Sequence, residues 1–409
     1  NPMDAHQVQQ GGDSSSSKNV WQFYLSGLSV LSREKIKNGE EVMKRVLILA
    51  VAVTLIFAGY LAFTTVDSKT PSLVAAAKTY SGTLYVAGMG GHFAKADITI
   101  DPNDSNNPIK VTNLDRIVIG DKVTHATHDA RVDANDKNVM FWSTFKADKD
   151  GKLHVGKTDL KTGEKITDVT IGIDPRAKGP APMYCASGQS KTAYMPITMA
   201  GEAYIDVFDK ATMKHKHRVF LDSIGYKKGT YQFFHGINSP DMKHMLVAVN
   251  MLGANGKPSG QVELVVLDLA ELEKGKVKMV AGKTLTGEPG KTIAFREYYT
   301  NDGKYIVQSG RDRMYLLNAK TLELIDEEMV KGENHDVIPT ADGKYAVLTL
   351  RETFADKKEG PGITDGTVQL YDVQAKKLVG KSVSVCLACH EKMGLKGSAV
   401  LCGLDANWK

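Results

Sequence analysis

Asp342-Gly343-Lys344-Tyr345-Ala346-Val347-Leu348 is one of five copies of a pattern in which a polar turn leads into a β-rich strand. In the other copies the turn ends at Lys137, Lys191, Lys243 and Lys304, so neighbouring copies are roughly 40 to 60 residues apart. A second pattern alternates with the first and consists of a strand, an acid or amide, a turn and another strand. Its markers are Asp101, Asp159, Asp209, Asp268, Asn318 and Asp372. We expect these marker side chains to cap their turns by accepting hydrogen bonds from nearby backbone amides.

Two hairpins in each repeat of about 50 residues supply four strands, which is the make-up of one blade of a β-propeller. The sequence therefore predicts an all-β fold, a propeller of about six to seven four-stranded blades over residues 79–385. Six repeats are readable, although the first lacks its opening turn, and a seventh is either hidden or built from both ends of the chain. A β-sandwich or a solenoid is the alternative, but a sandwich does not require two turn patterns that alternate at a steady period.

The overall composition is that of an ordinary globular protein. The 409 residues are 42% hydrophobic and 24% charged, with a net charge of +5. Lysines are scattered along the chain and no basic arm is present, so nucleic acid is not an expected partner.

Residues 43–78 form a predicted signal or membrane anchor followed by a linker. Met43-Lys44-Arg45 is a short cationic start, and residues 46–63 contain no charged side chain. This run is long enough for a hydrophobic helix that spans a membrane, and it also fits the core of a cleaved signal peptide. We favour an anchor through residues 46–63. The positive residues before it place the C-terminal bulk outside the cytoplasm, which predicts a periplasmic or other extracytoplasmic location.

Residues 1–42 do not continue this signal. They contain Gly11-Gly12 and a run of four serines, without a clear amphipathic pattern, and they precede a natural start at Met43. We interpret them either as a disordered tail or as a non-native upstream segment.

Near the C-terminus, Cys386-Leu387-Ala388-Cys389-His390 has the spacing of a covalent haem c attachment site. Each thiol can bond to one haem vinyl group, and His390 can bind the haem iron. Half of a zinc site or a thioredoxin-like pair are the alternatives. Zinc requires a second pair of ligands, and the sequence shows no βαβ unit for a thioredoxin-like motif. Residues 386–409 are too few for a separate cytochrome domain, so we expect this haem c segment to pack on the propeller.

Two points about this segment stay open in the sequence. Met393 lies only three residues beyond His390, so a Met or His of the propeller is the more plausible distal iron ligand. The remaining cysteines are Cys185 and Cys402. They either pair in the oxidising compartment or remain buried thiols.

Four residues occupy equivalent positions shortly before the polar turns, namely His128, His235, Arg296 and His335. We expect each at the start of an innermost strand, so that the symmetry of a propeller brings them together at one mouth of its channel. Such a ring can hold a metal cofactor or a small anion. The alternative is that each histidine caps its own blade with a buried hydrogen bond.

The pattern has one exception and one addition. The second readable repeat has Met183, Tyr184 and Cys185 in the equivalent region, and His125 is a further candidate. The other histidines of the propeller have the pattern of solvent-facing strand or turn residues. These are His92, His154, His215, His217 and His244.

The stretches 233–250 and 124–129 resemble blades of the haem d1 propeller of cytochrome cd1 nitrite reductases. This resemblance implies that His235 faces the substrate side of a haem d1, together with His335 and Arg296 as catalytic residues. It also implies that the segment with His125 and His128 carries the proximal ligand, which makes His128 a possible ligand of a second haem iron. In that family the haem c domain precedes a propeller of eight blades, whereas here the haem c motif follows the propeller.

These observations predict an exported c-type cytochrome with a β-propeller, which transfers electrons in an anaerobic-type respiratory chain. One alternative is a haem d1-like oxidoreductase of the nitrite reductase type, with its active site at the propeller centre. Another is a docking subunit of a membrane respiratory complex. All three require a redox partner protein or complex outside the cytoplasm.

Overall fold

The computed structural model describes residue 43 and residues 78–88, 90–177, 184–353, 364–385, 389 and 402–409. The chain divides into two units, residues 1–75 and 76–409, and all but one of the described residues belong to the second. The expected tail at 1–42 and the expected helix at 46–63 lie outside the described residues. Within the described part of the chain, no helix is both long enough and apolar enough to cross a membrane.

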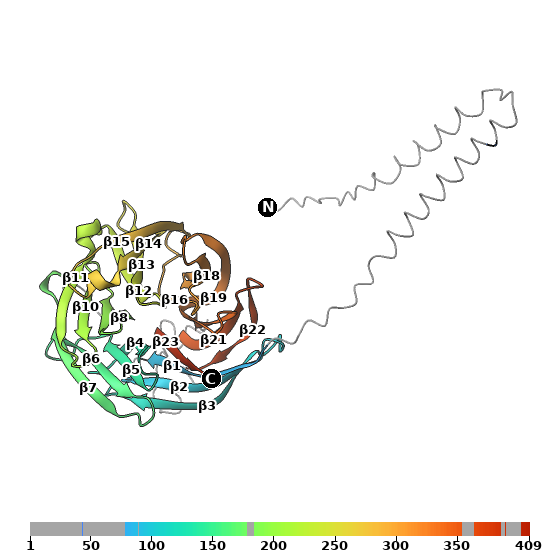
Figure 1. Cartoon of the computed structure of the whole chain (residues 1–409), viewed down its shortest axis with the longest axis horizontal. Coiled ribbons are helices and arrows are strands. Elements are labelled where there is room, and N and C mark those ends of the chain that lie inside the picture. Colours follow the sequence, from blue (N-terminus) through green and yellow to red (C-terminus); the bar gives the residue numbers. More distant parts are fainter. Residues whose placement is uncertain are drawn as a thin grey trace, which may run out of the picture. The chain divides into compact units, whose positions relative to one another are not determined.

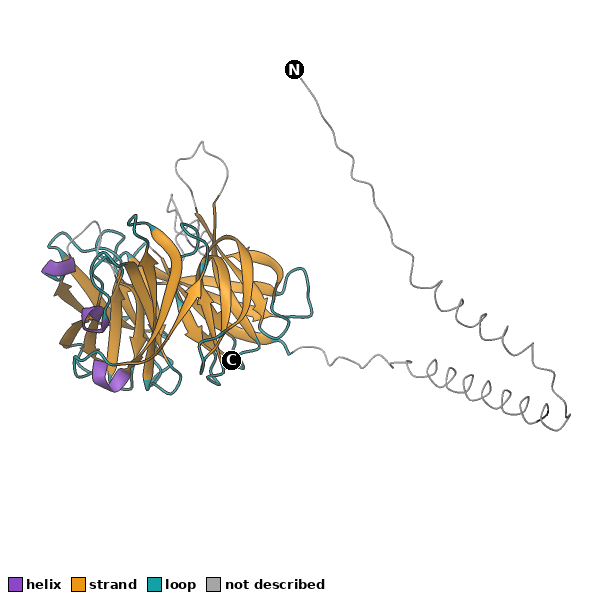
Figure 2. Ribbon diagram, turned by 90° about the horizontal axis from the view of Figure 1, so that it is seen from above, coloured by secondary structure: helices purple, strands orange, loops and turns teal. Residues whose placement is uncertain are grey.

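The described residues form an all-β structure of antiparallel, propeller-like blades (Figures 1 and 2), which confirms the predicted fold class at that level. Blade 1 contains β23 (Cys402–Trp408), β1 (Tyr80–Gly88), β2 (His92–Ile100) and β3 (Ile109–Val118). Blade 2 contains β4 (Thr127–Val132), β5 (Val139–Thr144), β6 (Lys152–Asp159) and β7 (Lys165–Gly172). Blade 3 contains β8 (Tyr184–Gln189), β9 (Ala193–Thr198), β10 (Tyr204–Asp209) and β11 (His215–Phe220).

The second half of the ring has the same organisation. Blade 4 contains β12 (Tyr231–Asn238), β13 (His244–Leu252), β14 (Pro258–Asp268) and β15 (Met279–Thr286). Blade 5 contains β16 (Glu297–Tyr299), β17 (Tyr305–Ser309), β18 (Arg311–Asn318) and the first half of β19 (Leu324–Pro339). Blade 6 contains the second half of β19, β20 (Tyr345–Thr353), β21 (Thr364–Asp372) and β22 (Lys377–Ser384). Three short helical turns complete the described elements: η1 (Pro175–Ala177), η2 (Leu221–Ile224) and α3 (Leu269–Leu272).

Blade 1 is built from both ends of the chain, an arrangement that the sequence suggested for a seventh repeat rather than for the first. β23 pairs antiparallel with β1 from Gly82↔Trp408 to Ala87↔Cys402 and supplies the innermost strand. Residues 402–408 are therefore part of a blade, although the sequence placed the end of the propeller at residue 385 and assigned 386–409 to the haem c segment. The physical reason is that an inner strand that closes a ring needs no polar turn after it.

The alternation of side chains along each strand explains why the blades close into a ring. On β1, Leu84 and Val86 pack towards blade 6, whereas Tyr85 and Ala87 pack towards blade 2. This is the period of two expected for a strand whose two faces are both buried. Each of the six junctions between neighbouring blades has one such hydrophobic cluster among the described residues.

The predicted turn caps are confirmed. Asp159 Oδ1 accepts hydrogen bonds from the N–H groups of Lys161 and Thr162, at 2.7 and 2.9 Å. The five other markers accept backbone N–H bonds in the same way: Asp101, Asp209, Asp268, Asn318 and Asp372. One acceptor therefore fixes each outer turn of the repeat.

The six innermost strands β23, β4, β8, β12, β16 and β19 contact one another in this order around the axis and lie nearest the centre of Figure 1. We call the end of the blades at which these strands begin the entry face. The connections from the outer strand of one blade to the inner strand of the next lie on this face. The described ends of β22 and β23, Ser384 and Cys402, are therefore strand ends at the entry face.

Candidate functional site

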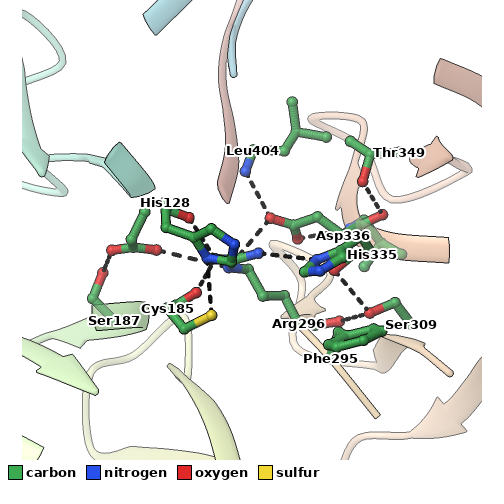
Figure 3. Close-up of polar contacts among 12 residues, drawn as sticks. His128, Cys185, Ser187, Phe295, Arg296, Ser309, His335, Asp336, Thr349 and Leu404 are labelled. Atoms are coloured by element: carbon green, nitrogen blue, oxygen red, sulfur yellow. Dashed lines mark hydrogen bonds and ion pairs between the residues drawn. The ribbon is translucent and has the colours of Figure 1, made fainter. Parts of the chain in front are cut away.

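Five inner strands place one side chain each at the entry-face end of the axis, a set that we call the ring. Its members are His128, Cys185, His235, Arg296 and His335, and each is at most 3% exposed. Figure 3 shows the guanidinium of Arg296 with three other members, His128, Cys185 and His335, around it. The structure thus brings together the four residues that the sequence predicted, and it adds Cys185. Blade 1 contributes no side chain at this level because it has Gly403, whose Cα lies against the backbone of residues 128–130.

β-Bulges turn three of these side chains towards the axis. Thr127 pairs with Thr144 and Asp129 with Ser143, so His128 is an extra residue on β4. The same shift leaves Cys185 extra on β8 and His335 extra on β19. A bulge of one residue redirects a side chain that would otherwise point between the blades.

Arg296 crosses the axis and donates hydrogen bonds to three other blades. Its Nη2 lies 2.5 Å from the carbonyl oxygen of His128 and 3.0 Å from Nδ1 of the same residue, and it also donates to the carbonyl oxygen of Cys185. Its Nη1 lies 3.4 Å from Nδ1 of His335. A guanidinium can only donate, so Nδ1 of His335 acts as an acceptor and that imidazole carries its hydrogen on Nε2, whereas the two hydrogens of Nη2 are shared among three acceptors of His128 and Cys185.

The three ring histidines are neutral at physiological pH. Burial lowers the pKa of His128 and of His235 well below the ordinary value, and the positive charge of Arg296 adds to the effect. The pKa of His335 is also lowered by burial, then by Arg351 and Arg296. Neutral imidazoles beside one permanent cation form a site that can bind an anion or a metal ion through nitrogen.

His235 differs from the other two histidines in its hydrogen bonding. Its side chain is fully buried, and neither ring nitrogen has a hydrogen-bond partner of ordinary geometry among the described residues. The backbone of Ala294 is close enough to oppose part of the pKa shift, but it does not complete a hydrogen bond. A buried polar group without a partner costs about 1–3 kcal/mol, so this position calls for an explanation.

Phenylalanines cover the ring towards the entry face. Phe295 stacks on the imidazole of His335 with the centroids 4.0 Å apart. Its ring meets that of His235 edge to face, with the centroids 5.9 Å apart. Phe145 stacks on His128 at 4.3 Å. Phe233 lies next to His235 and Phe295 and completes an apolar wall.

Below the ring, buried acids tie neighbouring blades together. Asp129 accepts hydrogen bonds from Ser187 and Tyr194, and Asp336 accepts one from the N–H of Leu404 at 2.6 Å. Asp405 accepts one from the N–H of Val132 at 2.7 Å. Each bond joins two adjacent blades, so the charges under the ring also hold the propeller closed.

Burial perturbs several of these acids. It raises the pKa of Asp405 to about 6, although Arg131 opposes the shift. It also raises the pKa of Asp336, against the opposing effect of Arg296. Glu297, which is fully buried, has its pKa raised well above the ordinary value by burial. Two permanent cations, Arg131 in this layer and Arg296 in the ring above it, therefore lie beside buried acids that resist ionisation.

Of the haem c motif, only Cys389 is among the described residues, and Cys386 and His390 lie outside them. The side chain of Cys389 is 2% exposed and packs in the cluster between blades 6 and 1. Its N–H donates to the carbonyl oxygen of Val385 at 3.1 Å. This is the i to i−4 bond of an α-helical turn.

The sequence left open whether Cys185 and Cys402 form a disulfide, and only the side chain of Cys185 is described. Cys185 Sγ lies 2.9 Å from Nδ1 of His128 and 3.4 Å from Sδ of Met199. The side chain of Cys402 is outside the described residues, so a bond between Cys185 and Cys402 stays untested.

His125 is not part of the ring, although the sequence grouped it with His128. It contacts Asp168 on the outer strand of blade 2 instead. His92 is 1% exposed rather than solvent-facing, and His154 is partly buried beside Asp168. Sequence periodicity missed both because burial at a strand end depends on the neighbouring blade or on a third strand.

A cavity of about 430 Å³ opens at the opposite end of the axis, away from the ring. Its walls include Asp133, Asn238, Tyr298, Asn407 and Trp408, at the ends of the inner strands and in the turns that follow them. Its described lining does not include the histidines or the arginine of the ring.

Comparison with known proteins adds little to this description. No protein-family model matches the chain, and no curated protein matches it in sequence. Among solved structures, the mitotic checkpoint complex gives a TM-score of 0.43 at 10% identity, over 72% of this chain and 76% of that one. Hydrazine synthase of Kuenenia stuttgartiensis gives 0.43 at 12% identity, over 69% and 74%. Likeness at this level assigns no function.

Proposed function

We propose that the protein is an exported c-type cytochrome in which residues 386–390 hold one covalent haem and the propeller supports electron transfer to a redox partner. The observation that carries this proposal is the environment of Cys389, whose side chain is buried in the cluster between blades 6 and 1 and whose N–H donates to the carbonyl oxygen of Val385.

The surroundings of Cys389 fit such a group. Its sulfur lies in an apolar cluster with Val385 and Leu404, and a thioether to a largely apolar macrocycle suits this environment. Bound haem would supply one-electron chemistry. The chain's own part is to hold the two thioether sulfurs, to offer His390 as an iron ligand, and to exclude water from one side through the interblade cluster.

The position of the motif between β22 and β23 favours the entry face as the site of electron exchange. β22 ends at this face and β23 begins there. The ring of buried histidines and Arg296 lies at the same end of the blades. A haem at this face would be available to a partner that docks there and would be close in the fold to any ligand at the ring.

Production of the full chain with a c-type cytochrome maturation system tests the haem proposal. The wild-type protein should give a haem-stained band on a denaturing gel and a thioether-linked haem spectrum in alkaline pyridine. Cys386→Ala and Cys389→Ala should weaken or abolish both signals. Cys402→Ala is the matched control, since it removes a cysteine outside the motif, and it should retain them. A haem signal that survives the double replacement of Cys386 and Cys389 would overturn the assignment.

The export proposal rests on the sequence signal at residues 43–63 and on the requirement that haem c be attached outside the cytoplasm. A reporter fused after Lys409 should be active in the periplasm only. The docking alternative predicts co-purification with a membrane respiratory complex after mild detergent extraction. Recovery of the protein as a free periplasmic electron carrier would count against that alternative.

A reductase site at the ring is the second candidate, and the unpartnered imidazole of His235 favours it. A small anion beside His235, Arg296 and His335 would give the imidazole of His235 a hydrogen-bond partner. The guanidinium charge would stabilise the anion. A second haem that binds through His128 would have to displace existing contacts, because Phe145 stacks on that imidazole and Arg296 contacts its Nδ1. The arrangement therefore suits a small ligand better than a macrocycle.

Titration of the haem-loaded protein with nitrite tests this second candidate. The expected result is saturable binding and reductase activity that His235→Ala removes while haem c stays attached. His244→Ala, on blade 4 but outside the ring, is the matched control. A protein that is reducible but inert towards nitrite and similar oxyanions leaves electron transfer or docking as the function.

A further inference from the structure

Blade 2 contains a second cluster of ligand-type side chains, outside the ring. His125 precedes β4, His154 lies on β6, and Asp168 lies on β7. One ligand atom from each of the three lies within 4.8 Å of the other two. Their side chains are 10%, 13% and 20% exposed, so the cluster is largely shielded from water but can be reached from solvent.

Asp168 connects the two imidazoles. His125 Nε2 lies 2.8 Å from Oδ2 of Asp168, and His154 Nδ1 lies 2.9 Å from Oδ1. The two imidazole centroids are 4.5 Å apart. Lys165 Nζ also contacts Oδ2 at 2.8 Å.

The hydrogen-bond partners of His125 determine which nitrogen carries its hydrogen. The hydroxyl of Thr124 donates to Asp121 Oδ2 at 2.8 Å, so its oxygen is available to His125 only as an acceptor. His125 Nδ1, 2.7 Å away, must therefore donate to it. In the neutral imidazole the lone pair then lies on Nε2 and faces the carboxylate of Asp168. Two acceptors in contact require a cation between them.

His154 has the same requirement. Its Nδ1 faces Asp168, and its Nε2 faces Asp148 Oδ2 at 3.2 Å. A neutral imidazole has one hydrogen for these two carboxylates, so one of the contacts again lacks a donor. One divalent cation held between the two imidazoles and Asp168 would take the place of the missing donor in both contacts.

We propose that His125, His154 and Asp168 bind a divalent transition-metal ion such as Zn²⁺. The metal would take Nε2 of His125, Nδ1 of His154 and a carboxylate oxygen of Asp168. The other nitrogen of each imidazole would keep its hydrogen and donate it, to Thr124 in one case and to Asp148 in the other. Metal-binding histidines usually have an outer partner of this kind. Three protein ligands leave a position for water or a small ligand.

Charge and ligand type support a borderline metal rather than Ca²⁺ or Mg²⁺. Two imidazoles and one carboxylate are the ligands that Zn²⁺ and Cu²⁺ prefer, whereas Ca²⁺ and Mg²⁺ prefer oxygen. The carboxylates of Asp121, Asp148 and Asp168 surround the cluster, and Lys165 is the cation in direct contact with Asp168. Lys165 therefore competes with the metal for this oxygen.

Calorimetric titration of the chelator-treated, haem-loaded full chain with Zn²⁺ tests the proposal. We expect one Zn²⁺ per chain with a dissociation constant in the micromolar range or below. His154→Gln and Asp168→Asn should each weaken binding by about tenfold or more, because each removes a direct ligand. His244→Gln is the matched control and should leave binding unchanged. Equal affinity of wild-type and His154→Gln, or no uptake of Zn²⁺ by wild-type, would overturn the proposal.

Two further measurements separate a metal site from a merely structural cluster. Lys165→Met removes the competing cation and should tighten Zn²⁺ binding. If the cluster is only structural, the same replacement should leave Zn²⁺ binding unchanged or make it weaker. With Cu²⁺ as the probe, electron paramagnetic resonance should show coupling to two imidazole nitrogens in wild-type and to one in His154→Gln. Weaker binding in Lys165→Met, or a Cu²⁺ spectrum without nitrogen coupling, would contradict the assignment even if the other variants fail to fold.

Discussion

Arg296 on blade 5 donates a hydrogen bond of 2.5 Å to the carbonyl oxygen of His128 on blade 2, across the axis of the propeller. This contact joins residues that are 168 positions apart in the chain. The same guanidinium bonds to the imidazoles of His128 and His335 and lies 3.7 Å from the carboxylate of Asp336. One side chain therefore links blade 5 to blades 2 and 6 across the axis.

Replacement of Arg296 should be strongly destabilising. Arg296→Leu removes this donor from the carbonyl oxygens of His128 and Cys185 and removes the charge that faces two buried acids at 3.7 and 3.9 Å, and breaking a buried ionic network costs about 3–5 kcal/mol. Denaturant unfolding of the haem-loaded protein measures this loss. Arg176→Leu is the matched control: this exposed arginine pairs with Glu202 and Asp222, and its loss should cost no more than about 1 kcal/mol. A similar unfolding free energy for both variants would contradict the structural role assigned to Arg296.

Closure of the propeller by β23 predicts a strong effect at Gly403. This residue has a φ of 44°, and a Cβ there would lie 2.7 Å from Cα of Asp129 and 2.8 Å from the carbonyl oxygen of His128. Gly403→Ala should therefore cost about 2 kcal/mol or more, because the inner strands of blades 1 and 2 must separate. Gly201→Ala, where a Cβ meets nothing within 4 Å, should be close to neutral. A thermal melt of both variants decides between them; equal midpoints would refute the close approach of the two strands.

His235 and His128 should respond in opposite ways to an apolar replacement. His235→Leu removes a buried group whose two nitrogens lack partners, so the unfolding free energy should stay the same or rise. His128→Leu removes an imidazole whose Nδ1 contacts Nη2 of Arg296 at 3.0 Å and Sγ of Cys185 at 2.9 Å, and should cost about 1–3 kcal/mol. Unfolding curves without added anion measure both. If His235→Leu is the more damaging of the two, His235 has a structural partner and the case for a ligand there fails.

The raised pKa of Asp405 predicts that the difference in unfolding free energy between wild-type and Asp405→Asn depends on pH. Burial raises its pKa to about 6, from about 4 in an unfolded chain. Between these values the folded state keeps the proton that the unfolded state has released, so this group's stabilisation is present below pH 4 and is lost as the pH rises to 6. The loss is about 3 kcal/mol.

Asp405→Asn cannot ionise, so its unfolding free energy relative to wild-type should rise by about this amount between pH 4 and pH 7. The ring histidines have lowered pKa values and give the opposite slope, with stability lost as the pH falls below about 6.5. This slope is common to both proteins and cancels in the difference. A difference that is constant over the whole range would show that the carboxyl of Asp405 is not desolvated.

Much of the blade architecture could be predicted from local chemistry. The capped turns at Asp159 and its equivalents and the strands after Lys137, Lys243 and Lys344 each fall within one hairpin, so a few neighbouring residues define them. The closing strand β23 could not be predicted in this way. Its partner β1 lies more than 300 residues earlier in the chain, and register between such distant strands leaves no local pattern.

The repeat predicted four of the five ring positions, but it did not single out Cys185. His128 and His335 lie seven residues before their turns, whereas His235 and Arg296 lie six before theirs, and this offset reflects the bulges at His128 and His335. Cys185 is the bulged residue of blade 3, but it lies only four residues before Gln189, because the turn after β8 is shorter than the turn after β4, so the spacing did not single it out. The cluster of His125, His154 and Asp168 depends on pairing across β6 and β7, for which the sequence gives no comparable signal.

The central claim is that Cys386 and Cys389 hold one covalent haem, and intact mass spectrometry of the mature protein tests it most directly. After c-type maturation and acid–acetone extraction, the wild-type chain should exceed its polypeptide mass by one haem. The chain with both Cys386→Ala and Cys389→Ala should have the polypeptide mass alone. A wild-type chain that is matured under these conditions, folds, and still shows only its polypeptide mass would contradict the assignment of a c-type cytochrome.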